Sequence, residues 1–290
     1  MRCACIDIGS NTTRLLVAEA AHGRLSSVLQ QRAFTRIGRC TDALGAIPEE
    51  TIAAVAGVVA EQRTAAEVAG AAHVRVVATA AIRRAANRDA LVEALRERAG
   101  VEVAVLSADD EGRLAFAGAT RTLERAPLGT IAVVDVGGMS TEIAIGTMAG
   151  GVTWMRSFSI GSGMLAARCR QDPPSPADVK AMRAAAEAAF AVADVPRLDH
   201  AVAVGGSAAS LPTLVGPVLD AAAIERALGT LGAAPAATVA RHHGLAPERA
   251  ELLPAGILVL DAAARRLGMP LRIGRGGLRE GVILELAVGI

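Results

Sequence analysis

Two short segments of this chain place an acidic residue, small residues and hydroxyl side chains in the same order. Residues 6–14 read Ile-Asp-Ile-Gly-Ser-Asn-Thr-Thr-Arg, and residues 134–142 read Val-Asp-Val-Gly-Gly-Met-Ser-Thr-Glu. A shift of 128 positions brings Asp7 onto Asp135. A carboxylate at a strand end, followed by small residues with free backbone N–H groups, suits phosphate bound together with a divalent metal. Capping of each turn by its own Asp is the alternative, and the in-register pair favours the ligand role.

Each copy lies between two short apolar runs, so both predict a strand, a tight turn and a second strand. The expected strands cover residues 2–8 and 13–20 in the first copy and lie near 130–135 and 141–146 in the second. Further along, strand patterns alternate with helix patterns, and residues 230–238, which are rich in Ala, Gly and Pro, are expected to form a loop. We therefore predict an α/β fold with a mixed sheet in each half.

The length of 290 residues favours two domains. The duplicated hairpin suggests that the two halves share one fold and face a common ligand. We place the first domain at residues 1–124 and the second at residues 125–290, and we expect the last helix, residues 278–288, to be able to return to the first domain.

The composition argues against several classes of partner. The net charge is +1, so no general attraction to nucleic acid or to an anionic membrane is expected. Four Phe, one Trp and no Tyr leave little material for stacking on bases. No apolar run reaches the length of a transmembrane helix without a charge or a turn, so we expect a soluble cytoplasmic protein.

The charged and sulfur-containing side chains narrow the chemistry further. Lys180 is the only lysine, so any phosphate site must use arginine, backbone N–H groups and metal. The four cysteines lack metal-site spacing with any histidine, and we expect them to be buried, reduced and structural. They are Cys3, Cys5, Cys40 and Cys169.

The turn residues of both copies supply groups that suit an anion. Glycine lets the backbone approach a ligand closely, and hydroxyl and N–H groups can donate to phosphate oxygens. An ordinary tight hairpin is the alternative for either copy taken alone. The phosphate-binding candidates at the two tips are Gly9, Ser10, Asn11, Thr12, Gly137, Gly138, Ser140 and Thr141.

Further candidates lie outside the hairpins. Thr79 and Arg83 are one helical turn apart, so both could point at a phosphate, with the guanidinium acting as a fork. A solvated arginine is the alternative, and it suits Arg84 better. Gly206 and Ser207 follow a strand and form a second ligand-facing turn, for which we also expect phosphate contact.

Several motifs together resemble one family. The chain is similar to the exopolyphosphatase/guanosine pentaphosphate phosphohydrolase (Ppx/GppA) family of the actin-like phosphotransferase superfamily. This resemblance implies two actin-like, ribonuclease H-like domains with an interdomain cleft. The segments that carry it are Asp-Ile-Gly-Ser-Asn-Thr at 7–12, Ala-Thr-Ala-Ala-Ile-Arg at 78–83, Leu-Ser-Ala-Asp-Asp-Glu-Gly-Arg-Leu at 106–114, Asp-Val-Gly-Gly-Met-Ser-Thr-Glu at 135–142, Pro-Ala-Gly at 254–256 and Gly-Leu-Arg-Glu-Gly at 277–281.

The resemblance also implies roles for single residues. Asp7 and Asp135 would hold Mg²⁺, with Mn²⁺ as a substitute. Glu111 would be the catalytic base that orients or deprotonates the attacking water, although three acids that stabilise a helix start are the alternative there. Arg14 is a further candidate for phosphate contact. Arg113 is expected to pair with a neighbouring acid.

The expected activity is Mg²⁺-dependent release of terminal phosphate from inorganic polyphosphate, from guanosine pentaphosphate, or from both. Two positions depart from the family pattern, because Met139 and Ala108 stand where the family usually has glycine. These departures motivate one alternative, a non-catalytic member that binds polyphosphate or an alarmone. An ATP-dependent small-molecule kinase of the same superfamily is the other. A homodimer is kept as an open expectation.

Overall fold

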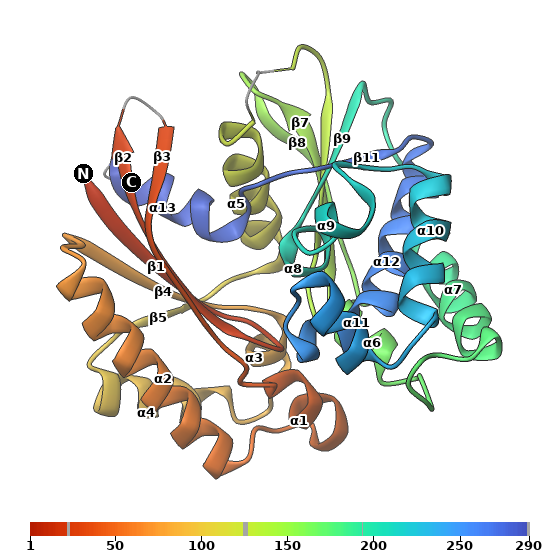
Figure 1. Ribbon diagram of the computed structural model, residues 1–290. Coiled ribbons are helices and arrows are strands. Elements are labelled where there is room, and N and C mark those ends of the chain that lie inside the picture. The colour runs from red at the N-terminus through yellow and green to blue at the C-terminus, as the bar shows by residue number, and fades with distance from the viewer. Residues whose placement is uncertain (22–23, 124–126, 193, 289–290) are drawn as a thin grey trace. The chain divides into compact units, whose positions relative to one another are not determined.

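The segments around Asp7 and Asp135 form the same hairpin in two separate sheets (Figure 1). The computed structural model describes residues 1–21, 24–123, 127–192 and 194–288. It divides into a first unit, Met1–Thr122 with Gly276–Ile290, and a second unit, Leu123–Arg275. The expected boundary between residues 124 and 125 lies outside the described residues, and the final helix belongs to the first unit.

The first unit places its helices on both faces of a mixed sheet (Figure 1). The strand order is β3-β2-β1-β4-β5, with the hairpin strands antiparallel and the later strands parallel. Its elements are β1 (Arg2–Ile8), β2 (Thr13–Ala21), β3 (Arg24–Ala33), α1 (Ile37–Leu44), α2 (Glu49–Val68), β4 (His73–Ala78), α3 (Ala80–Arg84), α4 (Arg88–Ala99), β5 (Val103–Val105), α5 (Ala108–Arg121) and α13 (Leu278–Val288).

The second unit repeats this plan and extends it by one short strand at the edge. Its strand order is β10-β11-β9-β6-β7-β8, and the long helix α12 packs against most of the other helices. Its elements are β6 (Ile131–Val136), β7 (Thr141–Thr147), β8 (Gly151–Phe158), α6 (Ser162–Ala166), α7 (Pro176–Phe190), β9 (His200–Val204), α8 (Gly205–Ala208), α9 (Pro212–Val215), β10 (Val218–Leu219), α10 (Ala221–Gly232), α11 (Ala236–His243), α12 (Pro247–Leu267) and β11 (Leu271–Ile273).

The duplication extends to register. Asp7 pairs with Arg14 across the first hairpin, and Asp135 pairs with Glu142 across the second. Each hairpin's second strand carries an irregularity against the third strand, at Val17/Ala18 in one unit and between Ile145 and Gly146 in the other. The two irregularities lie 128 positions apart, the same spacing as the two aspartates. The α/β fold with two mixed sheets is therefore confirmed.

One face of the first sheet carries the residues that matter for chemistry. Side chains alternate along a strand, so Cys3, Cys5 and Asp7 of β1 share a face. Cys3 and Cys5 pack with Leu114 of α5 and Ile283 of α13 in one apolar cluster. Asp7 therefore lies on the face of the sheet that α5 and α13 cover.

Glycines allow α5 and α13 to approach each other at backbone distance. An added Cβ at Gly118 would lie 2.7 Å from the Gly281 nitrogen, closer than real Cβ atoms come to other atoms. A Cβ at Gly281 would likewise meet the Leu114 backbone. This close packing fixes the C-terminal helix against the helix that carries Glu111.

Some elements differ from the sequence-based expectation. Helix α1 (Ile37–Leu44) was not predicted, and the segment expected to be a loop, 230–238, holds the end of α10 and the start of α11. The cysteine prediction is correct for Cys3 and Cys5, whereas Cys40 and Cys169 are only half-buried.

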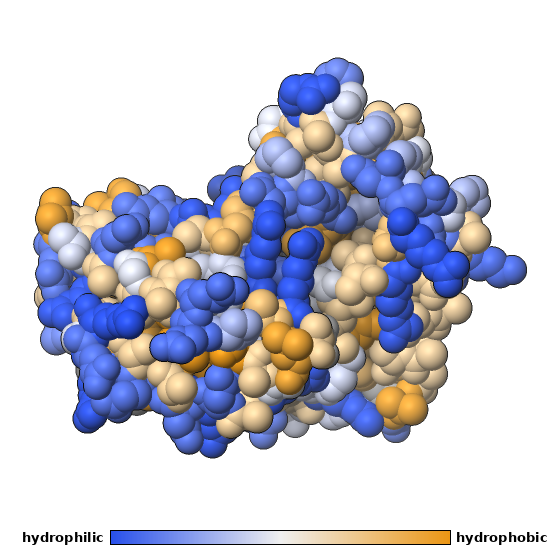
Figure 2. Space-filling view, turned by 90° about the horizontal axis from the view of Figure 1, so that it is seen from below, coloured by the Kyte–Doolittle hydropathy of each residue, from blue (hydrophilic) through white to orange (hydrophobic). Residues whose placement is uncertain are grey.

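The surface offers no large apolar area on the face that Figure 2 draws, where apolar side chains lie among polar ones. The described large apolar side chains that are most exposed come from separate elements or loops, and they are Leu44, Val68, Leu128, Val192 and Val288. Within the described ranges, no helix has both the length and the apolar character needed to cross a membrane.

Candidate functional site

The first hairpin tip is arranged as a cradle of backbone N–H groups. The Gly9 N–H donates to the Thr12 carbonyl at 3.0 Å, which closes the turn. The carbonyls of Ser10 and Asn11 accept N–H groups from the start of α1, from Gly38 at 2.7 Å and Arg36 at 3.1 Å. The N–H groups of Ser10, Asn11 and Thr12 find no backbone acceptor among the described residues. A tip with occupied carbonyls and available N–H groups suits an anion.

The second tip has the same design. The Gly137 N–H donates to the Ser140 carbonyl, again at 3.0 Å. The carbonyl of Gly138 accepts N–H groups of Gly163 at 2.9 Å and Met164 at 3.0 Å, both at the start of α6. In the described part of the chain, no backbone acceptor takes the N–H groups at positions 138–140. A short helix therefore orders each tip by binding its carbonyls.

Met139 does not distort the second tip. Its side chain is buried, with 3% of its surface exposed. Arg36 is the one non-glycine residue with positive φ among those described, so Met139 has an ordinary backbone conformation. The backbone at Met139 does not require glycine.

Asp7 has an unsatisfied carboxylate oxygen. The residue is 5% exposed, and its Oδ1 atom is buried without a hydrogen-bond partner in the described structure. Its Oδ2 atom lies 3.7 Å from Arg14 Nη2. Burial raises the pKa of the Asp7 carboxyl, and the cations of Arg14 and Arg279 oppose this effect. A buried carboxylate oxygen without a partner is a suitable ligand for a metal ion.

Two residues near Asp7 were not singled out from the sequence. Arg279 donates to the Leu15 carbonyl at 3.4 Å, and Glu280 accepts the Gly277 N–H at 2.9 Å. Burial lowers the pKa of the Arg279 guanidinium, and neighbouring Arg14 lowers it further. Both residues belong to the Gly-Leu-Arg-Glu-Gly segment, which was the available signal.

Glu111 lies in the first turn of α5 and is 7% exposed. Its Oε2 atom is 2.6 Å from Nη1 of Arg83, and the same Nη1 donates to the Leu106 carbonyl at 2.7 Å. The guanidinium expected to bind phosphate is thus bound to the expected base. Arg113 pairs with Asp110 and Glu285, as expected for an arginine beside acids.

Thr79 stands at the N-terminal end of α3 and is 7% exposed. Its hydroxyl makes no capping hydrogen bond and lies 3.5 Å from the Ile8 carbonyl, a long contact. The weak engagement leaves the hydroxyl able to turn toward a ligand.

Asp135 occupies the matching position in the second unit, with a different neighbour. Glu142 stands opposite it in register, where the first unit has Arg14. Residues directly opposite each other in an antiparallel pair have side chains on the same face. Glu142 is 5% exposed and accepts the Ser157 hydroxyl at 2.7 Å. Two carboxylates on one face favour a cation, and Glu142 was not singled out from the sequence.

The turn at 205–207 lies directly against Asp135. Gly205 has φ of +87°, and an added Cβ would be 2.5 Å from Asp135 Oδ1. The backbone at Gly206 lies against the guanidinium of Arg249, which is 7% exposed. Ser207 is 1% exposed, and its hydroxyl has no hydrogen-bond partner within the described ranges. Arg249 is another residue that sequence reasoning missed, because no motif links it to this turn.

Thr141 requires a correction. It is fully buried, and its hydroxyl donates to the Ile160 carbonyl at 2.7 Å. The equivalent Thr13 is also fully buried and contacts the Thr35 hydroxyl at 3.1 Å. Both threonines begin a strand, so their hydroxyls anchor the chain and do not face a ligand. Thr141 therefore leaves the set of phosphate-binding candidates.

The carboxylates fit Mg²⁺ better than a metal with a complete protein cage. Among the described residues, no three His, Cys, Asp or Glu side chains are grouped to hold a metal. Mg²⁺ keeps several waters and is commonly bound by one or two carboxylates together with substrate phosphate. Asp7 in the first unit, and Asp135 with Glu142 in the second, match this requirement.

Comparison with known proteins supports the resemblance noted above. The model of the Ppx/GppA phosphatase family matches residues 16–288. Exopolyphosphatase 1 of Mycobacterium tuberculosis strain H37Rv is 30% identical, over 98% of this chain and 88% of the relative. The crystal structure of the Aquifex aeolicus member of the Ppx/GppA family is 29% identical with a TM-score of 0.83, covering 100% of this chain and 98% of that one.

A further relative bears a different name. The guanosine-5'-triphosphate,3'-diphosphate pyrophosphatase of Aeromonas hydrophila is 28% identical over 98% of this chain. The match covers 59% of that longer relative. The two names describe different phosphorylated compounds, and the chain is similar to both proteins.

Proposed function

This chain belongs to the Ppx/GppA phosphatase family, and we propose that it is a Mg²⁺-dependent phosphohydrolase that releases terminal phosphate from inorganic polyphosphate, from guanosine pentaphosphate, or from both. Relatives named as an exopolyphosphatase and as a guanosine pyrophosphatase support these two substrates. Their identities of 30% and 28% are too similar to favour one substrate over the other.

The proposal gives each group one task. Glu111 accepts a proton from the water that attacks the terminal phosphorus, or orients that water. The N–H groups of the two tips, at residues 10–12 and 138–140, donate to phosphate oxygens. Asp7 and Asp135 hold Mg²⁺, which would offset negative charge on the phosphate when bound. This division matches phosphoryl transfer, where positioning and charge stabilisation supply most of the catalysis.

The carrying observation is the buried Glu111 carboxylate held by Arg83. A carboxylate that is 7% exposed and bound by a guanidinium at 2.6 Å has a fixed direction, as a base must have. Three acids that merely stabilised a helix start would be solvated. Asp109, the exposed neighbour on the same helix turn, meets that description, whereas Glu111 does not.

The test is phosphate release from polyphosphate and from guanosine pentaphosphate with Mg²⁺, using Glu111→Gln and the matched control Asp109→Asn. Loss of a general base should reduce kcat by about 100-fold or more. The Asp109→Asn protein should keep wild-type activity, because its side chain is exposed. Equal rates for Glu111→Gln and wild type would refute the role of Glu111.

The same assay separates the remaining alternatives. ADP formation that depends on an added small-molecule acceptor would identify a kinase. Tight polyphosphate binding without turnover, with either Mg²⁺ or Mn²⁺, would identify a non-catalytic member. The ordinary backbone at Met139 removes one reason for expecting that outcome.

A further inference from the structure

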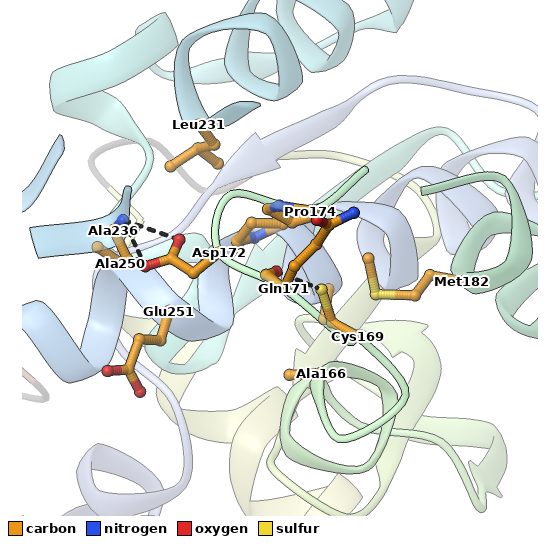
Figure 3. A pocket seen from close by; sticks show the side chains of 12 residues that line it. Ala166, Cys169, Gln171, Asp172, Pro174, Met182, Leu231, Ala236, Ala250 and Glu251 are labelled. Carbon is orange, nitrogen blue, oxygen red and sulfur yellow. Dashed lines mark hydrogen bonds between the residues drawn. The ribbon is translucent and has the colours of Figure 1, made fainter. Parts of the chain in front are cut away.

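A pocket in the second unit lies among residues that the proposed phosphate chemistry does not use. It is formed by the α6–α7 connection and by parts of α7, α10, α11 and α12 (Figure 3). Its volume is about 90 Å³. Because one water needs roughly 15 Å³ by this kind of measure, the pocket has room for about six water-sized groups.

The lining of this pocket selects against phosphate. Its apolar wall includes Ala166, Pro174, Met182, Leu231 and Pro254. Asp172 and Glu251 supply two carboxylates, and the residues lining the pocket include no Arg, Lys or His. Figure 3 shows the Glu251 side chain extending away from Asp172, so the two charges lie apart. An anionic ligand would meet carboxylates without a compensating cation, whereas a cation would be attracted.

The helix α12 adds a backbone acceptor to the same wall. Pro254 lies inside the helix and has no N–H, so the carbonyl of Ala250 loses its usual helical hydrogen bond. Ala250 and Pro254 both line the pocket. A ligand that donates a hydrogen bond could therefore satisfy this carbonyl. The Pro-Ala-Gly segment, 254–256, is a motif that the proposed reaction leaves without a task.

Asp172 is already committed to the protein. Both of its carboxylate oxygens accept the N–H of Ala236, at 2.9 and 3.0 Å, and so fix the start of α11 (Figure 3). Its charge nevertheless remains at the pocket, because a backbone N–H carries no net charge. Cys169 lines the same space and donates its thiol to the Gln171 carbonyl at 3.0 Å.

The pocket is one helix away from the turn beside Asp135. Residues 250, 251, 254 and 255 of α12 face the pocket. Arg249 and Gly256 of the same helix lie against Gly206 and Ser207. A ligand that shifts this stretch of α12 would therefore displace the 205–207 turn.

We propose that this pocket is a regulatory site for a small organic ammonium ion with a short apolar body. The apolar wall takes the hydrocarbon part, while the carboxylates and the Ala250 carbonyl receive the ammonium group. The volume limits the ligand to the size of a butylammonium ion. Its regulatory effect rests on the proposed hydrolase function, whereas its binding does not.

Binding can be measured without activity through the reactivity of Cys169. The wild-type protein is alkylated with N-ethylmaleimide, and labelling of Cys169 is followed by peptide mass spectrometry, with half-buried Cys40 as internal reference. We expect n-butylammonium chloride to slow Cys169 labelling at least two-fold relative to Cys40. Ammonium chloride and sodium butanoate at equal ionic strength should leave it unchanged. Equal protection by butanoate, or no protection by any of the three, would overturn the proposal.

Two variants test the position and the charge. Ala166→Leu fills part of the pocket and should abolish protection by n-butylammonium. Glu251→Gln keeps the shape and removes one charge, so protection should require at least two-fold more ligand. Protection that neither variant changes would place the ligand elsewhere and overturn the assignment.

The regulatory part is tested by phosphate release from polyphosphate. We expect n-butylammonium to change kcat or KM at least two-fold in wild type and to have no effect in Ala166→Leu, with ammonium chloride as control for ion binding to the substrate. Cys169 protection without a change in rate would overturn the regulatory role alone. An inactive wild type that still protects Cys169 would instead count against the proposed hydrolase function.

Discussion

Arg83 and Glu111 form an ion pair in which Nη1 and Oε2 lie 2.6 Å apart. The same Nη1 atom donates to the Leu106 carbonyl at 2.7 Å, on the segment that leads into α5. Arg83 stands on α3 and Glu111 on α5, the helices that follow the parallel strands β4 and β5. The pair therefore sets the direction of the carboxylate by joining two neighbouring strand ends.

Replacing Arg83 by Ala should affect both stability and activity. The Glu111 carboxylate would lose a charged hydrogen-bond donor while remaining buried, which we expect to cost about 2 kcal/mol of unfolding free energy. The rate of phosphate release should fall because the base is no longer held. Chemical denaturation and steady-state kinetics of the variant measure the two effects.

Arg84→Ala is the matched control for this change. Arg84 is adjacent in sequence and exposed, and the chain loses the same side chain without exposing Glu111. The two variants should differ clearly in kcat. If they lose activity equally, the Arg83–Glu111 pair does not position the base.

Asp7→Asn should stabilise the metal-free protein at neutral pH. Burial raises the pKa of Asp7, so the folded state holds its proton more tightly than the unfolded state does. The contribution of this carboxyl to stability is therefore fully present below its unfolded pKa and is lost as the pH rises through its folded pKa. We expect Asn, which carries no charge, to give the higher Tm at pH 8, with the difference vanishing in acid. A lower Tm for Asp7→Asn at pH 8 would contradict this.

Mg²⁺ should reverse that order. A ligand that binds only the folded state raises stability with its concentration, by about 2.7 kcal/mol at 100 times its Kd. The wild-type protein should gain Tm as Mg²⁺ is added, while Asp7→Asn should gain little. Thermal unfolding with a MgCl₂ series, and NaCl at matched ionic strength, separates binding from general screening. Equal gains in both proteins would remove Asp7 from the metal site.

The repeat at Asp7 and Asp135 was sufficient to predict both hairpins, because strand alternation and turn chemistry are local properties. The same locality explains the correct assignment of the long strands and of α12. Helix α1 was missed because it is short, and its N-terminus is ordered by the carbonyls of Ser10 and Asn11. Such an interaction depends on the folded hairpin and leaves little trace in the helix sequence.

Site residues followed the same division. Glu111 and the tip residues were found from motifs, whereas Arg249, Glu142 and Arg279 were not. Arg249 reaches Gly206 across more than 40 positions of sequence, a distance over which spacing carries no information. Thr141 was misassigned because its place in the motif does not indicate that the hydroxyl turns inward to the Ile160 carbonyl.

Gly205→Ala should disturb Asp135 more than backbone strain alone explains. Gly205 has φ of +87°, and a Cβ there would lie 2.5 Å from Asp135 Oδ1 and 2.9 Å from the Val136 carbonyl. Positive φ costs an alanine about 1 kcal/mol, and the overlap should add about 2 kcal/mol. Denaturant unfolding of the variant measures the total.

Gly216→Ala separates the two terms. Gly216 has a similar φ of +85°, and nothing lies within 4 Å of its added Cβ. It should therefore lose only the cost of the backbone conformation and retain phosphate release. If the two alanine variants are equally stable, the close approach of the 205–207 turn to Asp135 is wrong.

Ser107→Ala should weaken the start of α5 in a pH-dependent way. The Ser107 hydroxyl accepts the Asp110 N–H at 3.0 Å and donates to Asp110 Oδ2 at 2.7 Å, and this hydrogen bond is the main reason that the pKa of Asp110 is lowered. Loss of such a cap costs about 1 kcal/mol at pH 7. A lowered pKa gives stability that is present above the unfolded pKa and is lost as the pH falls through the folded pKa. The difference between wild type and Ser107→Ala should therefore shrink in acid, below about pH 4.

Because the cap also orders the helix turn that carries Glu111, Ser107→Ala should lower kcat more than it changes KM. Ser107→Thr keeps the hydroxyl at the cap and should restore both the stability and kcat. A general loss of packing would not be rescued by threonine and would not depend on pH in the acid range. Failure of threonine to restore kcat would mean that the cap does not position Glu111.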